Sequence, residues 1–135
     1  MSDTLKLEVV TPERLVLSDR VSEVQFPTAE RGYYGILPGH TPVMTAVGDG
    51  LLTYVKEGHK HWLTVFGGFA EAGPDRLTLL ARASETADMI DTDRAETARR
   101  RAEQRLSEHR SDIDMDRARA ALQRALVRLQ AHKGI

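Results

Sequence analysis

The sequence predicts an α+β protein in two parts, an N-terminal antiparallel β-sandwich (residues 1–84) and a C-terminal antiparallel α-helical hairpin (residues 85–135). All five prolines, nine of the ten glycines and all the aromatic residues precede Ser84. Turn formers and large core residues therefore gather in the first part. After Ser84 the chain is rich in alanine and arginine, which favour helix.

Strand patterning in the first part begins at residues 5–10, LKLEVV, where leucine and valine alternate with lysine and glutamate. This period of two is typical of a strand with one buried face. Turns rich in Pro, Gly and Asp separate the segments, a spacing typical of a sandwich or barrel. The other predicted strands are residues 14–18, 22–27, 50–57, 59–66 and 75–81. Proline cannot donate to a central ladder, so strand ends or edges are expected at Pro12, Pro27, Pro38 and Pro42.

The second part predicts two helices. Asp91 can cap the first, because its carboxylate can accept from the free amides of the first turn. Residues 108–114, EHRSDID, interrupt the helical pattern, and either Asp112 or Asp114 can cap the second helix. That helix is expected to fray before Gly134.

The apolar seam between these helices consists mainly of small side chains. At roughly 0.8 kcal/mol per buried methylene, alanine contributes much less than leucine, so we expect a marginally docked hairpin that can open. The second helix offers Met115, Ala118, Leu122, Ala125 and Leu129, and the first offers Ala95, Ala98, Ala102 and Leu106.

Charge and composition exclude several classes. The net charge is −1 and the pI is about 6.5, so the whole molecule has no cationic field for nucleic acid or anionic lipid. There is no cysteine, which removes disulfides and thiolate chemistry. The start has no signal-peptide pattern and no segment reaches membrane-spanning length, so we expect a cytosolic or peripherally bound protein.

His59 and His61 share one face of a predicted strand, where two imidazoles can bind a metal. No further ligand follows at a recognisable spacing, so an exposed strand face is the preferred interpretation and no metal is assigned. A metal-dependent sandwich enzyme remains an alternative. No serine elbow and no carboxylate pair in an apolar context are present, so no catalytic residue is predicted.

Residues 32–50, GYYGILPGHTPVMTAVGDG, form the densest predicted loop, and glycines and prolines constrain its backbone. It is either a rigid connection whose tyrosines cap the sandwich or an interaction tip. Composition does not decide between these.

Arginines of the hairpin follow two stripes, one with Asp91, Arg94, Ala98 and Arg101 and the other with Arg117, Arg124 and Arg128. If the stripes converge, their guanidinium groups can hold an anionic ligand. From the residues alone, a solvated face of intrahelical ion pairs, such as Arg119 with its acidic neighbours, is preferred. A nucleic-acid-binding module using this hairpin is a second alternative, which the near-zero hairpin charge disfavours.

Three motifs give the whole chain a strong resemblance to the epsilon subunit of the F-type ATP synthase. They are GILPGH at 35–40 followed by Pro42, GGF at 67–69, and IDxxRA at Ile90, Asp91, Arg94 and Ala95. The resemblance implies a rotor subunit of the central stalk without chemistry of its own. Its sandwich would bind the gamma subunit and rest on the c-ring, with the loop from Tyr33 to His40 touching the ring. Some relatives have an acidic residue where Tyr33 stands, so an aromatic or hydrogen-bonded contact is expected here.

The resemblance also implies that the hairpin is a regulatory arm. Extended, it would inhibit ATP hydrolysis and present Arg117, Arg119, Arg124 and Arg128 to an acidic segment of the catalytic beta subunit. Folded, it would bind regulatory ATP through the IDxxRA residues with Arg101, Arg124 and Arg128, close to Glu85. No cofactor is required. The implied location is the cytoplasmic face of the bacterial cell membrane, reached only indirectly, and the coupling ion is left open.

Overall fold

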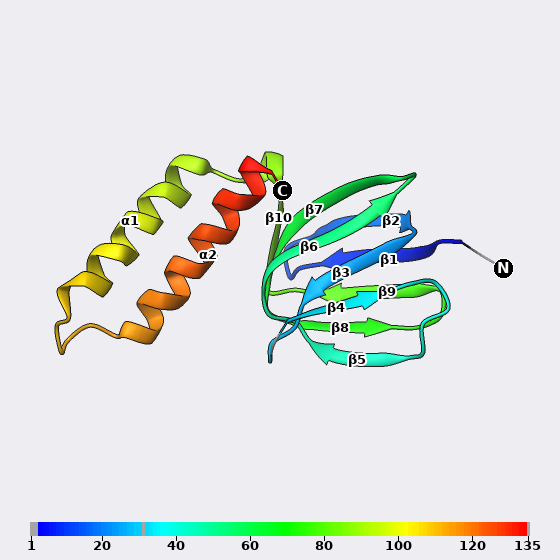
Figure 1. Ribbon diagram of the computed structural model, residues 1–135, viewed down its shortest axis with the longest axis horizontal. Helices are drawn as coiled ribbons and strands as arrows, with labels where there is room; N and C mark the ends of the chain where they lie inside the picture. The colour runs from blue at the N-terminus through cyan, green and yellow to red at the C-terminus, as the bar shows by residue number, and fades with distance from the viewer. Residues whose placement is uncertain (1–2, 31, 135) are drawn as a thin grey trace.

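The computed structural model describes residues 3–30 and 32–134, which form a sandwich of two sheets and a pair of helices (Figure 1). Sheet A has the order β2 (Leu15–Val21), β1 (Leu5–Val10), β9 (Arg76–Leu80), β8 (Phe69–Ala72) and β5 (Val43–Ala46). Sheet B has the order β10 (Ala83–Thr86), β7 (His59–Phe66), β6 (Asp49–Lys56), β3 (Glu23–Pro27) and β4 (Tyr33–Ile36). A short 3-10 helix, η1 (Ala87–Met89), leads to α1 (Thr92–Glu108) and α2 (Met115–Lys133).

The main core lies between the sheets and follows the predicted alternation. On β1 the side chains of Leu5, Leu7 and Val9 are fully buried, and Lys6 and Glu8 point outward. Leu52 and Leu63 face them from sheet B. Burying such a side chain stabilises the fold by roughly 1.5–3 kcal/mol. No hairpin residue belongs to this core cluster, so the arm is not part of the sandwich interior.

Four short strands and one pairing differ from the predicted sandwich. Residues 32–50, expected as one loop, contain β4 and β5, and neither β8 nor β10 was predicted. Each has only four residues, too few for an alternation to stand out from its glycine and proline neighbours. The described strand pairs are antiparallel except β1 with β9, which is parallel.

Strand β10 continues the sandwich past the predicted boundary at residue 84. It pairs with β7, and two hydrogen bonds that involve side chains add to this pairing. Ser84 Oγ donates to the Thr64 carbonyl at 2.7 Å, and the Glu85 amide donates to Thr64 Oγ1 at 2.9 Å. Sheet B therefore extends to Thr86, immediately before the hairpin linker.

The GGF step has a steric basis at Gly68. Its φ is 106°, and a Cβ built there would lie 1.9 Å from the Leu80 carbonyl oxygen. Only glycine fits where β7 passes into β8 so close to β9.

Both helices begin at aspartate caps. Asp91 accepts from the Arg94 amide at 3.0 Å, as predicted. Asp114 accepts from the Arg117 amide at 3.0 Å, so it, and not Asp112, caps α2. Asp112 instead pairs with Arg110 at 2.8 Å.

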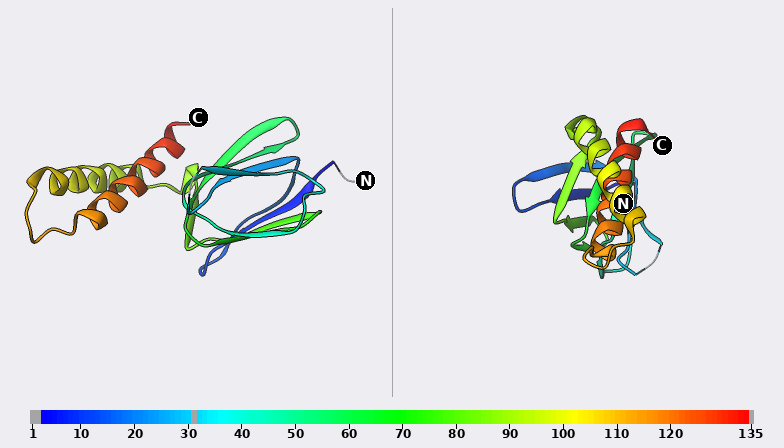
Figure 2. Two further views of the ribbon diagram at one scale, coloured as in Figure 1. Left: turned by 60° about the horizontal axis from the view of Figure 1, so that its bottom comes forward. Right: turned by 90° about the vertical axis from the view of Figure 1, so that its left-hand side faces the viewer.

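The hairpin projects away from one end of the sandwich, with the C-terminal part of α2 beside sheet B (Figures 1 and 2). Its buried residues in the seam are alanines, Ala95 and Ala102 on α1 and Ala118 and Ala125 on α2, and the larger seam residues are only partly buried. Neither helix of the described residues has the length and the apolar run that a membrane crossing requires.

Docking of α2 on the sandwich depends on a second, smaller hydrophobic cluster. Val127 and Ala131 of α2 meet Leu51 and Phe66 of sheet B, together with Ile90 of the linker. This cluster is small and separate from the main core, which consists of sandwich residues alone.

Candidate anion-binding site on the hairpin

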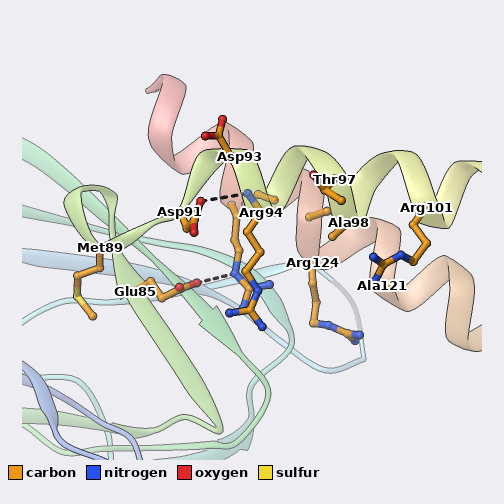
Figure 3. A pocket seen from close by; sticks show the side chains of 13 residues that line it. Glu85, Met89, Asp91, Asp93, Arg94, Thr97, Ala98, Arg101, Ala121 and Arg124 are labelled. Carbon is orange, nitrogen blue, oxygen red and sulfur yellow. Dashed lines mark hydrogen bonds and ion pairs between the residues drawn. The ribbon is translucent and has the colours of Figure 1, made fainter.

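A pocket of about 820 Å³ lies where α1 and α2 meet the end of β10 and η1 (Figure 3). The predicted nucleotide-binding residues that line it are Asp91, Arg94, Ala95, Arg101, Arg124 and Arg128. Arg94 and Arg101 of the first predicted stripe therefore meet Arg124 and Arg128 of the second, whereas Arg117 does not line the pocket. Alanines 95, 98, 121 and 125 line the pocket between the arginines. Their small side chains leave the space that the arginines surround.

Three arginines of the pocket have free guanidinium groups. Among residues 3–30 and 32–134, the guanidinium groups of Arg94, Arg101 and Arg124 have no hydrogen bond or ion pair. Four hairpin arginines outside the pocket pair with acidic neighbours: Arg99, Arg100, Arg110 and Arg119. Unpaired guanidinium groups facing one cavity favour an anionic ligand, because each can donate two parallel hydrogen bonds to phosphate or carboxylate.

Arg128 has a different role from the other three. Its Nε donates to Glu85 Oε1 at 2.6 Å, and its guanidinium lies 4.6 Å above the centre of the Phe66 ring. Both side chains of the ion pair are only about a quarter to a third exposed (31% and 25%). Arg128 thus joins α2 to β10 and β7 while it lines the pocket.

The IDxxRA motif serves the pocket by geometry as well as by charge. Asp91 caps α1, so the partial positive charge of the helix N-terminus lies at the pocket rim. Ala95 is buried and leaves room beside Arg94. Ile90 does not line the pocket, contrary to its predicted place in the site, because it is packed into the second cluster against Phe66 and Val127.

Sequence reasoning left several lining residues unassigned. Glu85, Met89 and Asp93 add an acidic and partly apolar rim, and Thr97 adds a hydroxyl. Ala98 belonged to the predicted α1 stripe, and Ala121 lies one turn before Ala125, so helical spacing was the signal for both. Met89 had no such signal, because its position depends on η1 and on a contact of 3.7 Å with Arg14.

The predicted contact residues Tyr33 and His40 are not brought together. Tyr33 begins β4 and is 60% exposed, and its hydroxyl lies beside Gly50. His40 follows the other end of β4 and meets the ring of Tyr34, with 5.7 Å between centres. Leu37, which was not singled out from the sequence, is 58% exposed at the start of the same loop.

The four arginines predicted to meet a beta subunit divide into two pairs. Arg124 and Arg128 face the pocket. Arg117 and Arg119 lie near the start of α2 and are exposed, with Arg119 paired to Asp116 at 2.7 Å. In the folded hairpin these side chains do not form one continuous surface.

His59 and His61 have ordinary local contacts. His59 Nδ1 lies 3.0 Å from the Glu57 carbonyl oxygen, and His61 stacks on Tyr54 with 5.1 Å between centres. The described part of the chain contains no group of three or more His, Asp or Glu that could hold a metal. Nearby, the Lys56 ammonium donates to Asp19 at 2.6 Å across the two sheets, which lowers the pKa of Asp19 and raises the pKa of Lys56.

Comparisons with known proteins agree over almost the whole chain. The family model "ATP synthase, Delta/Epsilon chain, beta-sandwich domain" matches residues 4–87, and "ATP synthase, Delta/Epsilon chain, long alpha-helix domain" matches residues 88–133. The ATP synthase epsilon chain of Koribacter versatilis is 45% identical over 106 residues, covering 78% of this chain and 74% of that one. The epsilon chain of Pelotomaculum thermopropionicum is 48% identical over 108 residues, covering 79% and 80%.

A chain in the cryo-EM structure of the Euglena gracilis mitochondrial ATP synthase (OSCP/F1/c-ring, rotational state 1) has the same fold. The TM-score is 0.81 at 20% identity, covering 99% of this chain and 84% of that one.

Proposed function

Because this chain belongs to the ATP synthase delta/epsilon chain family and is a non-catalytic subunit of the central stalk, we propose that it couples ion translocation to ATP synthesis and restrains ATP hydrolysis through its C-terminal hairpin. We further propose that the folded hairpin senses ATP. The observation that carries this regulatory role is the pocket in which Arg94, Arg101 and Arg124 face one cavity, with no partner for their guanidinium groups among the described residues.

ATP would stabilise the folded arm because its binding site exists only there. The pocket is lined by α1, α2, β10 and the linker, so extension of the arm removes the site. A ligand that binds one state shifts the population toward it by its difference in affinity for the two states. The alanine-rich seam and the small second cluster favour an equilibrium that such a ligand can move.

Inhibition would use arginine side chains that line the pocket while the hairpin is folded. Extended beside gamma, α2 would present Arg117, Arg119, Arg124 and Arg128 to an acidic segment of the catalytic beta subunit. Since Arg124 and Arg128 line the pocket in the folded arm, ATP and the beta subunit would compete for the same side chains.

An apolar row across the outer face of sheet A supports contact with the gamma subunit. Strand register places Leu15 beside Val10, Val10 beside Leu80, Leu80 beside Phe69 and Phe69 beside Ala46. Leu80 and Phe69 are 57% and 60% exposed. A continuous exposed apolar surface of this kind marks a protein–protein interface.

Contact with the c-ring would be made by Tyr33 and by the loop that carries Leu37 and His40. The exposed tyrosine and leucine favour an aromatic and apolar contact. The chain would then reach the cytoplasmic face of the bacterial cell membrane only through the ring, as part of the membrane-bound complex.

Removal of residues 88–135 tests the inhibitory role. The main core lies entirely before residue 80, so the sandwich should still assemble with the complex. Hydrolysis of ATP by the assembled enzyme should rise. Unchanged hydrolysis with intact assembly would contradict inhibition by the hairpin.

A further inference from the structure

The contact between the arm and the sandwich is concentrated in the last turns of α2. Val127, Arg128 and Ala131 are the α2 residues with apolar, ionic or ring contacts to sheet B, and the rest of the hairpin projects away (Figure 2). Whatever holds these turns therefore decides whether the arm stays docked.

Trp62 of β7 makes the one hydrogen bond between a side chain of the sandwich and the α2 backbone among the described residues. Its indole Nε1 donates to the Ala131 carbonyl oxygen at 2.9 Å. The last four carbonyls of an α-helix have no partner within the helix, and Ala131 lies in the last turn of α2. The indole thus satisfies a carbonyl that the helix itself leaves open.

The same ring is packed where the docking cluster is most enclosed. Trp62 is half-buried against the cluster that contains Leu51, Phe66, Val127 and Ala131, and Ala131 is fully buried. If the indole N–H is removed, the Ala131 carbonyl loses its partner in a site from which water is largely excluded. Leaving such a group unpaired is more costly than losing an exposed hydrogen bond.

We propose that Trp62 is the latch of the regulatory arm: its bond to the Ala131 carbonyl holds the C-terminus of α2 on the sandwich, and breaking it releases the arm. This inference rests on the proposed movable arm, but it concerns docking alone and needs neither ATP nor a partner subunit. The Arg128 ion pair with Glu85 is a second contact, and it can be satisfied by water once the arm opens.

Thiol labelling measures the docking equilibrium directly, because the chain has no cysteine. Val127→Cys places a thiol inside the docking cluster, where it reacts only when the arm opens. Val65→Cys places a thiol in the main core, where it reacts only on global unfolding. The isolated full chain carrying either cysteine is treated with a thiol reagent, and the rate of labelling is measured.

Trp62→Phe keeps an aromatic ring and removes the donor. A net hydrogen bond of this kind corresponds to about a 2- to 12-fold change in an equilibrium constant, so labelling at position 127 should speed up by at least this factor. Labelling at position 65 should not change. Tyr54→Phe is the matched control, since it removes a polar group from an aromatic ring of β6 that has no hydrogen bond to the arm.

Equal labelling rates at position 127 in the Trp62→Phe and Tyr54→Phe variants would contradict the proposal that Trp62 holds the arm. A parallel rise at positions 127 and 65 would also overturn it, since that pattern reports a weakened sandwich. Either result leaves ATP binding and hydrolysis untouched, so failure of the latch is distinguishable from failure of the proposed function.

Discussion

Substitution of Arg124 by alanine should weaken ATP binding without weakening the fold. Arg124 lines the pocket, and its guanidinium has no partner among the described residues, so its removal breaks no internal bond. A hydrogen bond to a charged group contributes about 1.5–3 kcal/mol, which corresponds to roughly a 10- to 150-fold rise in Kd. The cost should appear fully in binding, because nothing within the protein offsets it.

Calorimetry on the isolated chain measures this effect, with Arg105→Ala as the matched control. Arg105→Ala removes the same positive charge as Arg124→Ala. Arg105 is exposed in the last turn of α1 and does not line the pocket, so ATP binding should be unaffected by its removal. Arg128→Ala is a poorer probe, because it also breaks the Glu85 ion pair. Equal affinities for the Arg124→Ala and Arg105→Ala variants would refute the assignment. Absence of binding in the millimolar range by the unmodified chain would remove ATP sensing as physiology.

Further substitutions test the sandwich. Gly68→Ala should lower the free energy of unfolding by at least about 2 kcal/mol in a urea titration, because φ is 106° and the new Cβ meets the Leu80 carbonyl; an unchanged midpoint would contradict this. Asp19→Asn should cost less than about 1 kcal/mol at pH 7, since the pair with Lys56 is about a third exposed. The Lys56 hydrogen bond lowers the pKa of Asp19, so this contribution is present above the unfolded pKa of about 3.9 and disappears as pH falls through the folded pKa. The difference in free energy of unfolding between the unmodified chain and Asp19→Asn, measured by urea titration, should therefore be larger at pH 7 than at pH 2. Phe69→Glu should abolish copurification with gamma while leaving thermal unfolding nearly unchanged, because the side chain is exposed; retained copurification would exclude this face.

Local patterns predicted the fold well where they were long. Residues 5–10 and 59–66 are strands with the predicted bounds, because alternation over six to eight residues is unambiguous. The four-residue strands β4, β5, β8 and β10 were not predicted, and β4 and β5 were wrongly assigned to a loop. The parallel pairing of β1 with β9 was also not predicted, because residues so far apart in sequence carry no local sign of their neighbour.

Helical spacing predicted that the arginine stripes can converge, but it could not identify which charges are already paired. The preferred solvated face describes Arg119, which pairs with Asp116 on its own helix. It is wrong for Arg124, which faces the pocket. Arg128 was predicted to bind ATP in the folded arm and the beta subunit in the extended arm. Neither prediction included its bond to Glu85, which joins α2 to a strand that precedes both helices. Periodicity within one helix carries no information about such a contact.

Both attachments of the hairpin to the sandwich lie at the same end, since the linker enters α1 there and the last turns of α2 dock there. The hairpin is therefore attached to the sandwich at one end only, here called its root, and any tilt would turn it about that end. At 1.5 Å per residue, the 19 residues of α2 span about 28 Å, so a tilt of about 20° would carry the connection between the helices through an arc of roughly 10 Å. A small displacement at the root is thus magnified at the tip, and the tip is the part that would travel furthest within a rotating assembly.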